Sequence, residues 1–173
     1  MKKIAVFIAD GSEELEALTP VDVLRRTGAK CDIISVNGEY IKSSHGITIK
    51  ADAVIDSVDL DNYDALIIPG GMPGATNISS CEKAVKAIKK AIQDKKLVSA
   101  ICASPAVVLA DNGLLSVNKA TCYPAPDFIN SLGEKYTGTE VEVCENVITA
   151  NGPKSAFKFA LTICEKLNLT PKF

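Results

Sequence analysis

Apolar, β-branched runs alternate along the chain with stretches whose apolar residues recur at helical spacing. Such runs are typical of strands buried on both faces, and the stretches between them are typical of helices that cover a sheet. The pattern predicts strands at Lys3–Ala9, Cys31–Val36, Ala65–Pro69 and Leu97–Cys102, with short strands at Ala120–Cys122 and Val147–Ala150. It predicts helices at Glu13–Thr27, Cys81–Lys95, Ser104–Asn112 and Lys154–Leu167, and a hairpin-like excursion over Tyr40–Ile49. The alternation indicates an α/β fold with a mostly parallel central sheet.

The first predicted helix carries signals at both ends. Ser12 is a plausible N-cap, and Gly28 follows the last turn. Pro20 marks an expected kink inside the helix.

Composition narrows the class of protein further. The chain has 173 residues, 47% of them hydrophobic and 23% charged, which suits one globular domain over residues 1–173 and excludes a disordered chain. A net charge of −2 gives no attraction for nucleic acid or acidic membranes, so we expect neither as a partner. The apolar run Ile4–Ala9 is too short for a signal peptide, so we expect a cytoplasmic location. The six cysteines form no CxxC pair or Cys/His cluster, so we expect free thiols and no metal.

Cys102 is the first candidate for chemistry. It lies where a buried strand passes into a helix, and small residues stand two positions before and after it, at Ala100 and Ser104. This layout is typical of a nucleophile elbow, with cysteine in the place of serine. The following helix start favours a thiolate and is expected to lower the thiol pKa below about 8.5. A buried, inert cysteine is the alternative interpretation.

Acidic residues follow the first predicted strand. Glu13, Glu14 and Glu16 suit the first turn of a helix by charge alone. Glu13 or Glu16 could instead point over the sheet edge toward Cys102, where burial would keep the carboxyl protonated. A neutral carboxyl there could donate a hydrogen bond to a thiolate.

Two further features have both a structural and a chemical interpretation. The glycine-rich run Gly70–Ala75 is either a plain tight turn or a set of backbone N–H groups that face Cys102 as an oxyanion site. His45, the one histidine, is either an exposed turn residue or the base of a cysteine–histidine pair.

Together these segments resemble the ThiJ/PfpI superfamily, in the branch of the Parkinson-disease-linked protein and its bacterial relatives. The resemblance is carried by Gly11–Glu16, Pro20–Arg26, Pro69–Gly71, Ala100–Ala103, Asn151–Pro153, Phe157, Phe159 and Ala160. It implies a flavodoxin-like three-layer sandwich that forms a homodimer. It also implies that Cys102 is the reactive centre, that Glu16 is the inward glutamate, and that Gly71 and Ala103 form a backbone oxyanion pocket.

The resemblance also implies roles for residues at the pocket mouth. His45 and Arg26 fall where relatives carry residues that face the partner subunit's pocket, so His45 is expected nearer the partner's Cys102 than its own. Tyr123 stands where close animal relatives have a histidine. The chain ends soon after Leu169, where many relatives carry one more helix, so we expect pocket access or dimer packing to differ.

The function implied is a glyoxalase or deglycase that acts on small reactive aldehydes such as methylglyoxal without a cofactor. Ala103 stands where the peptidase branch has a histidine, which argues against proteolysis. The alternative is an oxidation sensor or redox-regulated chaperone, in which Cys102 is oxidised to a sulfinate held by Glu16 and backbone N–H groups.

Overall fold

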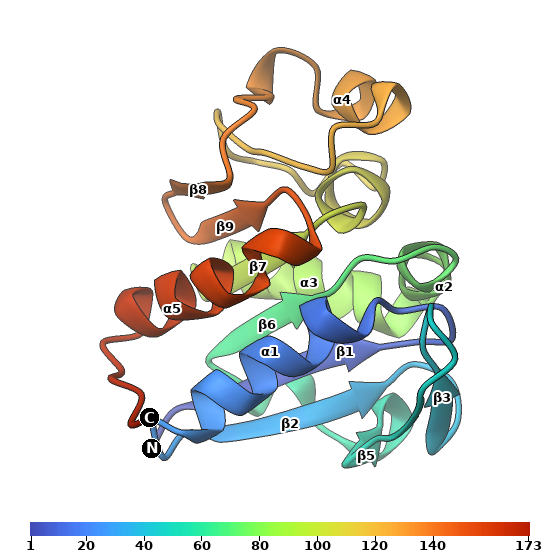
Figure 1. Ribbon diagram of the computed structural model, residues 1–173, viewed down its shortest axis with the longest axis vertical. Helices are drawn as coiled ribbons and strands as arrows, with labels where there is room; N and C mark the ends of the chain where they lie inside the picture. The colour runs from blue at the N-terminus through green and yellow to red at the C-terminus, as the bar shows by residue number, and fades with distance from the viewer.

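A seven-stranded sheet with helices on both faces forms the body of the molecule (Figure 1). The computed structural model describes residues 1–173. Its strands are β1 (Lys3–Ile8), β2 (Lys30–Ser35), β3 (Tyr40–Lys42), β4 (Thr48–Lys50), β5 (Ala53–Val54), β6 (Ala65–Ile68), β7 (Leu97–Ile101), β8 (Val141–Cys144) and β9 (Val147–Ala150). Its α-helices are α1 (Glu14–Arg25), α2 (Gly74–Ser79), α3 (Glu82–Gln93), α4 (Pro126–Leu132) and α5 (Ala156–Lys166).

The order of strands in the main sheet is β5-β2-β1-β6-β7-β9-β8. All neighbours run parallel except β8, which pairs antiparallel with β9. The strands β3 and β4 form a separate antiparallel hairpin. The predicted flavodoxin-like sandwich, the mostly parallel sheet and the hairpin near residues 40–49 are therefore confirmed.

Two apolar layers hold the helices to the sheet. On one face α1 packs beside α5 over a core that contains Phe159, Ile4 and Leu24. On the other face α2, α3 and a π-helical segment, Pro105–Ala110, cover a core that contains Phe7, Ile68 and Ile88. Because the central strands are buried on both faces, they read in sequence as continuous apolar runs. None of the helices combines the length and the apolar character that crossing a bilayer requires.

Several predicted elements differ from those observed. The cap of α1 is the Glu13 side chain, which accepts a hydrogen bond from Glu16 N–H at 2.8 Å; Ser12 Oγ instead accepts from Ala9 N–H. The predicted strand Ala120–Cys122 is wrong: Ala120 makes one isolated bridge to Tyr136, and the next N–H is taken by the Thr149 side chain.

Other differences concern helix type and short elements. The predicted helix over 104–112 is π-helical from Pro105 to Ala110, and the last helix begins with a 3-10 turn at Pro153–Ser155. α1 continues through Pro20 as one helix. The helices α2 and α4 and the strands β5 and β8 were not predicted.

Candidate functional site

Four neighbouring parallel strands end at one edge of the sheet, and the loops that follow them meet there. These strands are β1, β6, β7 and β9. The loops carry Gly11–Glu13, Gly70–Gly74, Cys102–Ser104 and Asn151–Pro153 respectively. The carboxyl edge of such a sheet is where α/β proteins bind ligands, and it holds Gly71, Cys102 and Ala103 from among the residues singled out in the sequence.

Cys102 turns the chain sharply at the end of β7. Its φ is +64°, in the left-handed region that side chains other than glycine rarely adopt. Two backbone hydrogen bonds fix this conformation: Cys102 N–H donates to Ala150 O at 2.9 Å, and Tyr123 N–H donates to Cys102 O at 2.8 Å. The elbow predicted from sequence is therefore present, and it holds the thiol over the sheet edge.

Glu16 is the carboxylate that points inward, whereas Glu13 serves as the helix cap. The Glu16 side chain is fully buried, and Oε2 accepts a hydrogen bond from Gly70 N–H at 2.8 Å. Oε1 has no hydrogen-bond partner of ordinary geometry, which leaves it free for the neighbouring Cys102 thiol. Burial raises the pKa of the Glu16 carboxyl to about 7, so near neutrality this group can either hold or accept a proton.

The thiol and this carboxyl control each other's protonation. Burial first, then the charge of Glu16 and its hydrogen bond, raise the pKa of the Cys102 thiol to about 12, while N–H groups of Gly71 and Ala103 lower it. The predicted lowering of the thiol pKa is wrong for this state, because an ionised carboxylate lies beside a buried sulfur. When Glu16 carries the proton, that charge is gone, and the two N–H groups oppose the effect of burial. The protonation state of Glu16 thus controls how readily the thiol ionises.

Glycine is required beside this pair for steric reasons. A Cβ at Gly70 would lie 2.6 Å from Cys102 Cβ and 2.7 Å from Glu16 Oε2. Gly71 has a φ of +82°, and a Cβ there would lie 2.5 Å from Glu13 N. The glycine-rich run therefore allows backbone to approach the site closely. Gly70 was not chosen from the sequence, although it belongs to the run that drew attention to Gly71.

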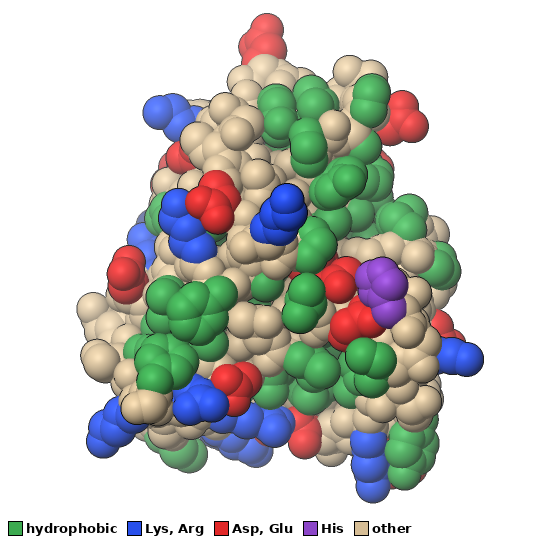
Figure 2. Space-filling model, in the orientation of Figure 1, with side chains coloured by type: hydrophobic (Ala, Val, Ile, Leu, Met, Phe, Trp, Pro, Cys, Tyr) green, Lys and Arg blue, Asp and Glu red, His purple; other side chains and the backbone are tan.

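His45 contacts the acidic residues at the start of α1. Its Nδ1 lies 3.1 Å from the Glu14 carboxylate and 3.8 Å from Glu13 Oε1, and Ser44 Oγ donates to Glu14 at 2.9 Å. The carboxylate of Glu14, by hydrogen bond and by charge, raises the pKa of His45. Figure 2 shows the histidine on the surface with acidic side chains beside it. Glu13, Glu14 and His45 are the one group of side chains close enough to one another to bind a metal ion together. Their contacts are those of a hydrogen-bonded histidine–carboxylate pair.

Arg26 lies away from the sheet edge that carries Cys102. It follows the last turn of α1, ten residues and thus about 15 Å along the helix from Glu16. Its Nε lies 2.9 Å from Asp22 Oδ2, and its guanidinium stacks 5.4 Å from the centre of the Phe173 ring. Arg26 is therefore not brought to the pocket of its own chain; the role implied for it at a partner's pocket stays a prediction.

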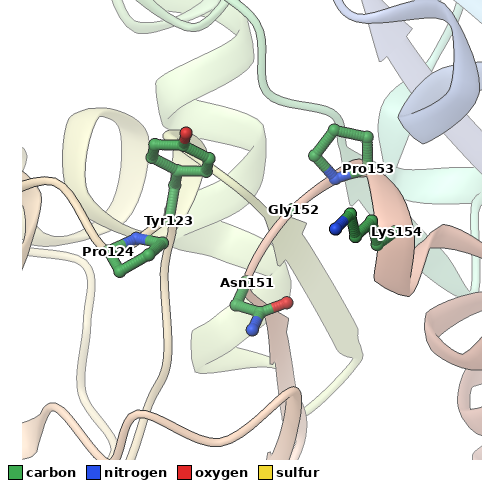
Figure 3. A pocket seen from close by; sticks show the side chains of 6 residues that line it. All are labelled: Tyr123, Pro124, Asn151, Gly152, Pro153 and Lys154. Carbon is green, nitrogen blue, oxygen red and sulfur yellow. The ribbon is translucent and has the colours of Figure 1, made fainter.

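Tyr123 lines an open pocket of about 380 Å³ next to the elbow. The other lining residues are Pro124, Asn151, Gly152, Pro153 and Lys154 (Figure 3). The Tyr123 ring is half-exposed and packs close to Gly152. Sequence reasoning gave no role to Lys154, because only the fold brings the end of β9 beside Tyr123.

Comparison with known proteins gives consistent matches over nearly the whole chain. Residues 2–166 match the DJ-1/PfpI family. Protein DJ-1 homolog B of Arabidopsis thaliana is 36% identical over 96% of this chain, which spans only 38% of that relative's length. The glutathione-independent glyoxalase DJR-1.2 of Caenorhabditis elegans is 35% identical, over 91% of this chain and 84% of the relative. The structure of oxidized Toxoplasma gondii DJ-1 superposes with a TM-score of 0.92 at 40% identity, covering 96% of this chain and 91% of that one.

Proposed function

Because the chain belongs to the DJ-1/PfpI family, we propose that it is a cysteine-dependent enzyme of the glyoxalase or deglycase type, which converts small 2-oxoaldehydes into 2-hydroxy acids. The observation that carries the proposal is the pairing of Cys102, on its elbow, with the buried Glu16 carboxyl whose pKa is raised to about 7. A group with that pKa can take and return protons at neutral pH. The name of the nematode relative supports this substrate class.

The first step is addition of the thiol to the aldehyde. Cys102 Sγ bonds to the aldehyde carbon, and the thiol proton passes to the aldehyde oxygen, which gives a hemithioacetal. In this proposal the N–H groups of Gly71 and Ala103, which lower the pKa of the thiol, stabilise the charge that develops during the addition.

Glu16 then moves one proton at a time. Its carboxylate takes the hydrogen from the carbon bonded to sulfur, and passes that proton to the neighbouring ketone oxygen, which gives an enediol. It next takes the hydroxyl proton from the carbon bonded to sulfur and delivers it to the second carbon, which leaves a thioester. Water cleaves the thioester, restores the thiol and releases the hydroxy acid, so the net reaction is the addition of one water.

Turnover of methylglyoxal in an amine-free buffer tests the proposal. Cys102→Ser should abolish formation of lactate, and Glu16→Gln should reduce it by roughly 10²–10⁴-fold, because the amide cannot carry the proton. Tyr123→Phe serves as a control: it removes one hydroxyl from the pocket wall and should cost less than about tenfold. A loss in Tyr123→Phe as large as in Glu16→Gln would overturn the role of Glu16. Turnover by the Cys102→Ser variant at the wild-type rate would overturn the proposal.

An oxidation sensor is the second candidate, favoured by one observation. Glu16 Oε1 is buried without a hydrogen-bond partner, and protonated Glu16 could donate to one oxygen of a Cys102 sulfinate. The oxidized state in the name of the Toxoplasma structure is consistent with such chemistry in a relative. Limited treatment with hydrogen peroxide, followed by mass spectrometry, should then place a sulfinate on Cys102 before any other cysteine. If methylglyoxal is not turned over, this second candidate becomes the better explanation of the site.

A further inference from the structure

The pocket lined by Tyr123 and Lys154 directly adjoins the Cys102 elbow. Tyr123 N–H donates to the carbonyl of Cys102, and Cys102 N–H donates to Ala150, the residue before Asn151. Tyr123, on one wall of the pocket, is therefore hydrogen-bonded to the backbone of the nucleophile, and Asn151, on the other wall, directly follows a residue that is. The pocket thus lies beside the elbow in the fold.

One wall of this pocket is positively charged. Lys154 makes no ion pair or hydrogen bond through its ammonium group within the chain, and Figure 3 shows that the side chain turns back toward Gly152 and the pocket. α5 begins two residues later, at Ala156, and the positive end of its dipole adds to the charge. Asn151 Oδ1 accepts a hydrogen bond from Ser155 Oγ at 2.6 Å, which leaves the amide N–H group of Asn151 to donate elsewhere.

The nearby carboxylate does not neutralise Lys154. Glu140 lies against Ser155, with 3.3 Å between Ser155 Oγ and Glu140 Oε1. Its other oxygen pairs with Lys158 Nζ at 2.8 Å, one helical turn beyond Lys154. The ammonium of Lys154 therefore remains available to an anion that enters the pocket.

We propose that this pocket selects substrates with a carboxylate tail, so that the preferred substrates are 2-oxoaldehydes whose chain ends in a carboxylate. The inference rests on the proposed function for the reacting end of the substrate. The Lys154 ammonium supplies the positive charge that binds a carboxylate, Asn151 is a polar neighbour on the same wall, and a volume of about 380 Å³ has room for a chain of a few carbon atoms. The aldehyde reacts at Cys102 while the tail lies beside Lys154.

The kinetic test compares 4,5-dioxopentanoate with 2-oxopentanal, a neutral aldehyde of the same chain length. Wild-type protein should show a higher kcat/KM for the charged substrate, and Lys154→Gln should reduce that preference by about fivefold, the effect of one partly exposed ion pair. Lys154→Arg should keep the preference. Lys166→Gln is the control, because it removes the same charge at the far end of α5, outside the pocket, and breaks no ion pair. An unchanged preference in Lys154→Gln, or an equal loss in Lys166→Gln, would overturn the inference.

A binding test separates this inference from the proposed function. 4-Oxopentanoate lacks the aldehyde and cannot be turned over, so its binding, followed by calorimetry, reports on the tail alone. It should bind wild-type protein more tightly than Lys154→Gln protein, and salt should weaken the difference. If neither aldehyde is turned over but this binding depends on Lys154, the proposed function fails and the carboxylate site stands. If 4-oxopentanoate binds both proteins equally or neither at all, the carboxylate site is refuted.

Discussion

Replacing Glu16 by glutamine should stabilise the chain at alkaline pH, although this residue lies at the centre of the site. The Glu16 side chain has no exposed surface, and burial raises its pKa from 4.5 to about 7. The folded chain therefore holds this proton more tightly than the unfolded chain. Between these two values the free energy of unfolding falls as the pH rises, and above about pH 7 it levels off at the lower value.

The size of this effect follows from the two pKa values. The difference between 4.5 and about 7, at about 1.4 kcal/mol per pH unit, corresponds to about 3 kcal/mol. Glutamine has nearly the same shape, stays neutral at every pH, and can accept the Gly70 N–H bond through its amide oxygen. At about pH 8 the variant should thus be more stable than the wild type by up to about 3 kcal/mol. The gain is smaller by the free energy that the glutamine N–H group costs if it finds no hydrogen-bond acceptor in this buried site.

Thermal unfolding at a series of pH values measures the difference. For a chain of this length 1 kcal/mol changes Tm by about 2–4 °C, so the variant should unfold about 6–12 °C above the wild type at about pH 8. The gap should close as the pH falls to about 4.5. His45, whose pKa is also raised, titrates in both proteins and cancels in the comparison.

Glu14→Gln provides a control of opposite sign. Hydrogen bonds and the charge of His45 lower the pKa of Glu14 despite its burial, so its ionised form stabilises the fold above its unfolded pKa. That variant should lose stability at neutral pH and approach the wild type only in acid. A difference between Glu16→Gln and wild type that stays constant from about pH 4.5 to pH 8 would refute the reasoning, since it would show that glutamine acts through packing.

Three further predictions concern the thiol, the glycine run and the assembly. Glu16→Gln should speed alkylation of Cys102 by iodoacetamide near pH 7, because it removes the carboxylate charge that raises the thiol pKa, although it slows turnover. Mass spectrometry measures the rate of alkylation, and a slower rate in the variant would contradict this. Gly70→Ala should lower the free energy of unfolding, measured by chemical denaturation, by about 1–3 kcal/mol, because its Cβ would overlap Cys102 and Glu16. Gly38→Ala is the control, because its Cβ would meet nothing closer than 4.0 Å. Equal losses in the two variants would count against the argument. The chain should form a homodimer in which His45 lies nearer the partner's thiol than its own, and a mass of 18.3 kDa by sedimentation would exclude it.

The central strands could be predicted from sequence because burial on both faces leaves a continuous apolar run. β8 could not, because it is an edge strand whose four residues remain partly or fully exposed. α4 has only seven residues, too few to show a helical period. The sequence could not show that Glu13, and not Ser12, caps α1. In the folded loop the Ser12 hydroxyl accepts a hydrogen bond from Ala9 N–H, so it does not cap the helix.

The site residues could be predicted where residues next to them in the sequence mark their role. The elbow at Cys102 and the close approach at Gly71 both follow from small residues next to each other in sequence. Which glutamate turns inward was open from the residues alone, because Glu13 and Glu16 lie on adjacent turns. The thiol pKa was mispredicted because it depends first on the burial of the sulfur and then on the Glu16 carboxylate, which lies 86 residues earlier in the sequence. Lys154 was missed because its pocket exists only after the end of β9 is placed beside Tyr123.

The backbone conformation at Cys102 also bears on natural selection. A side chain at a φ of +64° costs on the order of 1–3 kcal/mol. Glycine at position 102 would relieve this cost and leave the two backbone hydrogen bonds of the elbow intact. Selection for stability alone would therefore favour glycine at this position. The cysteine marks a residue kept for its reactivity, at a standing expense in stability that the rest of the fold must offset.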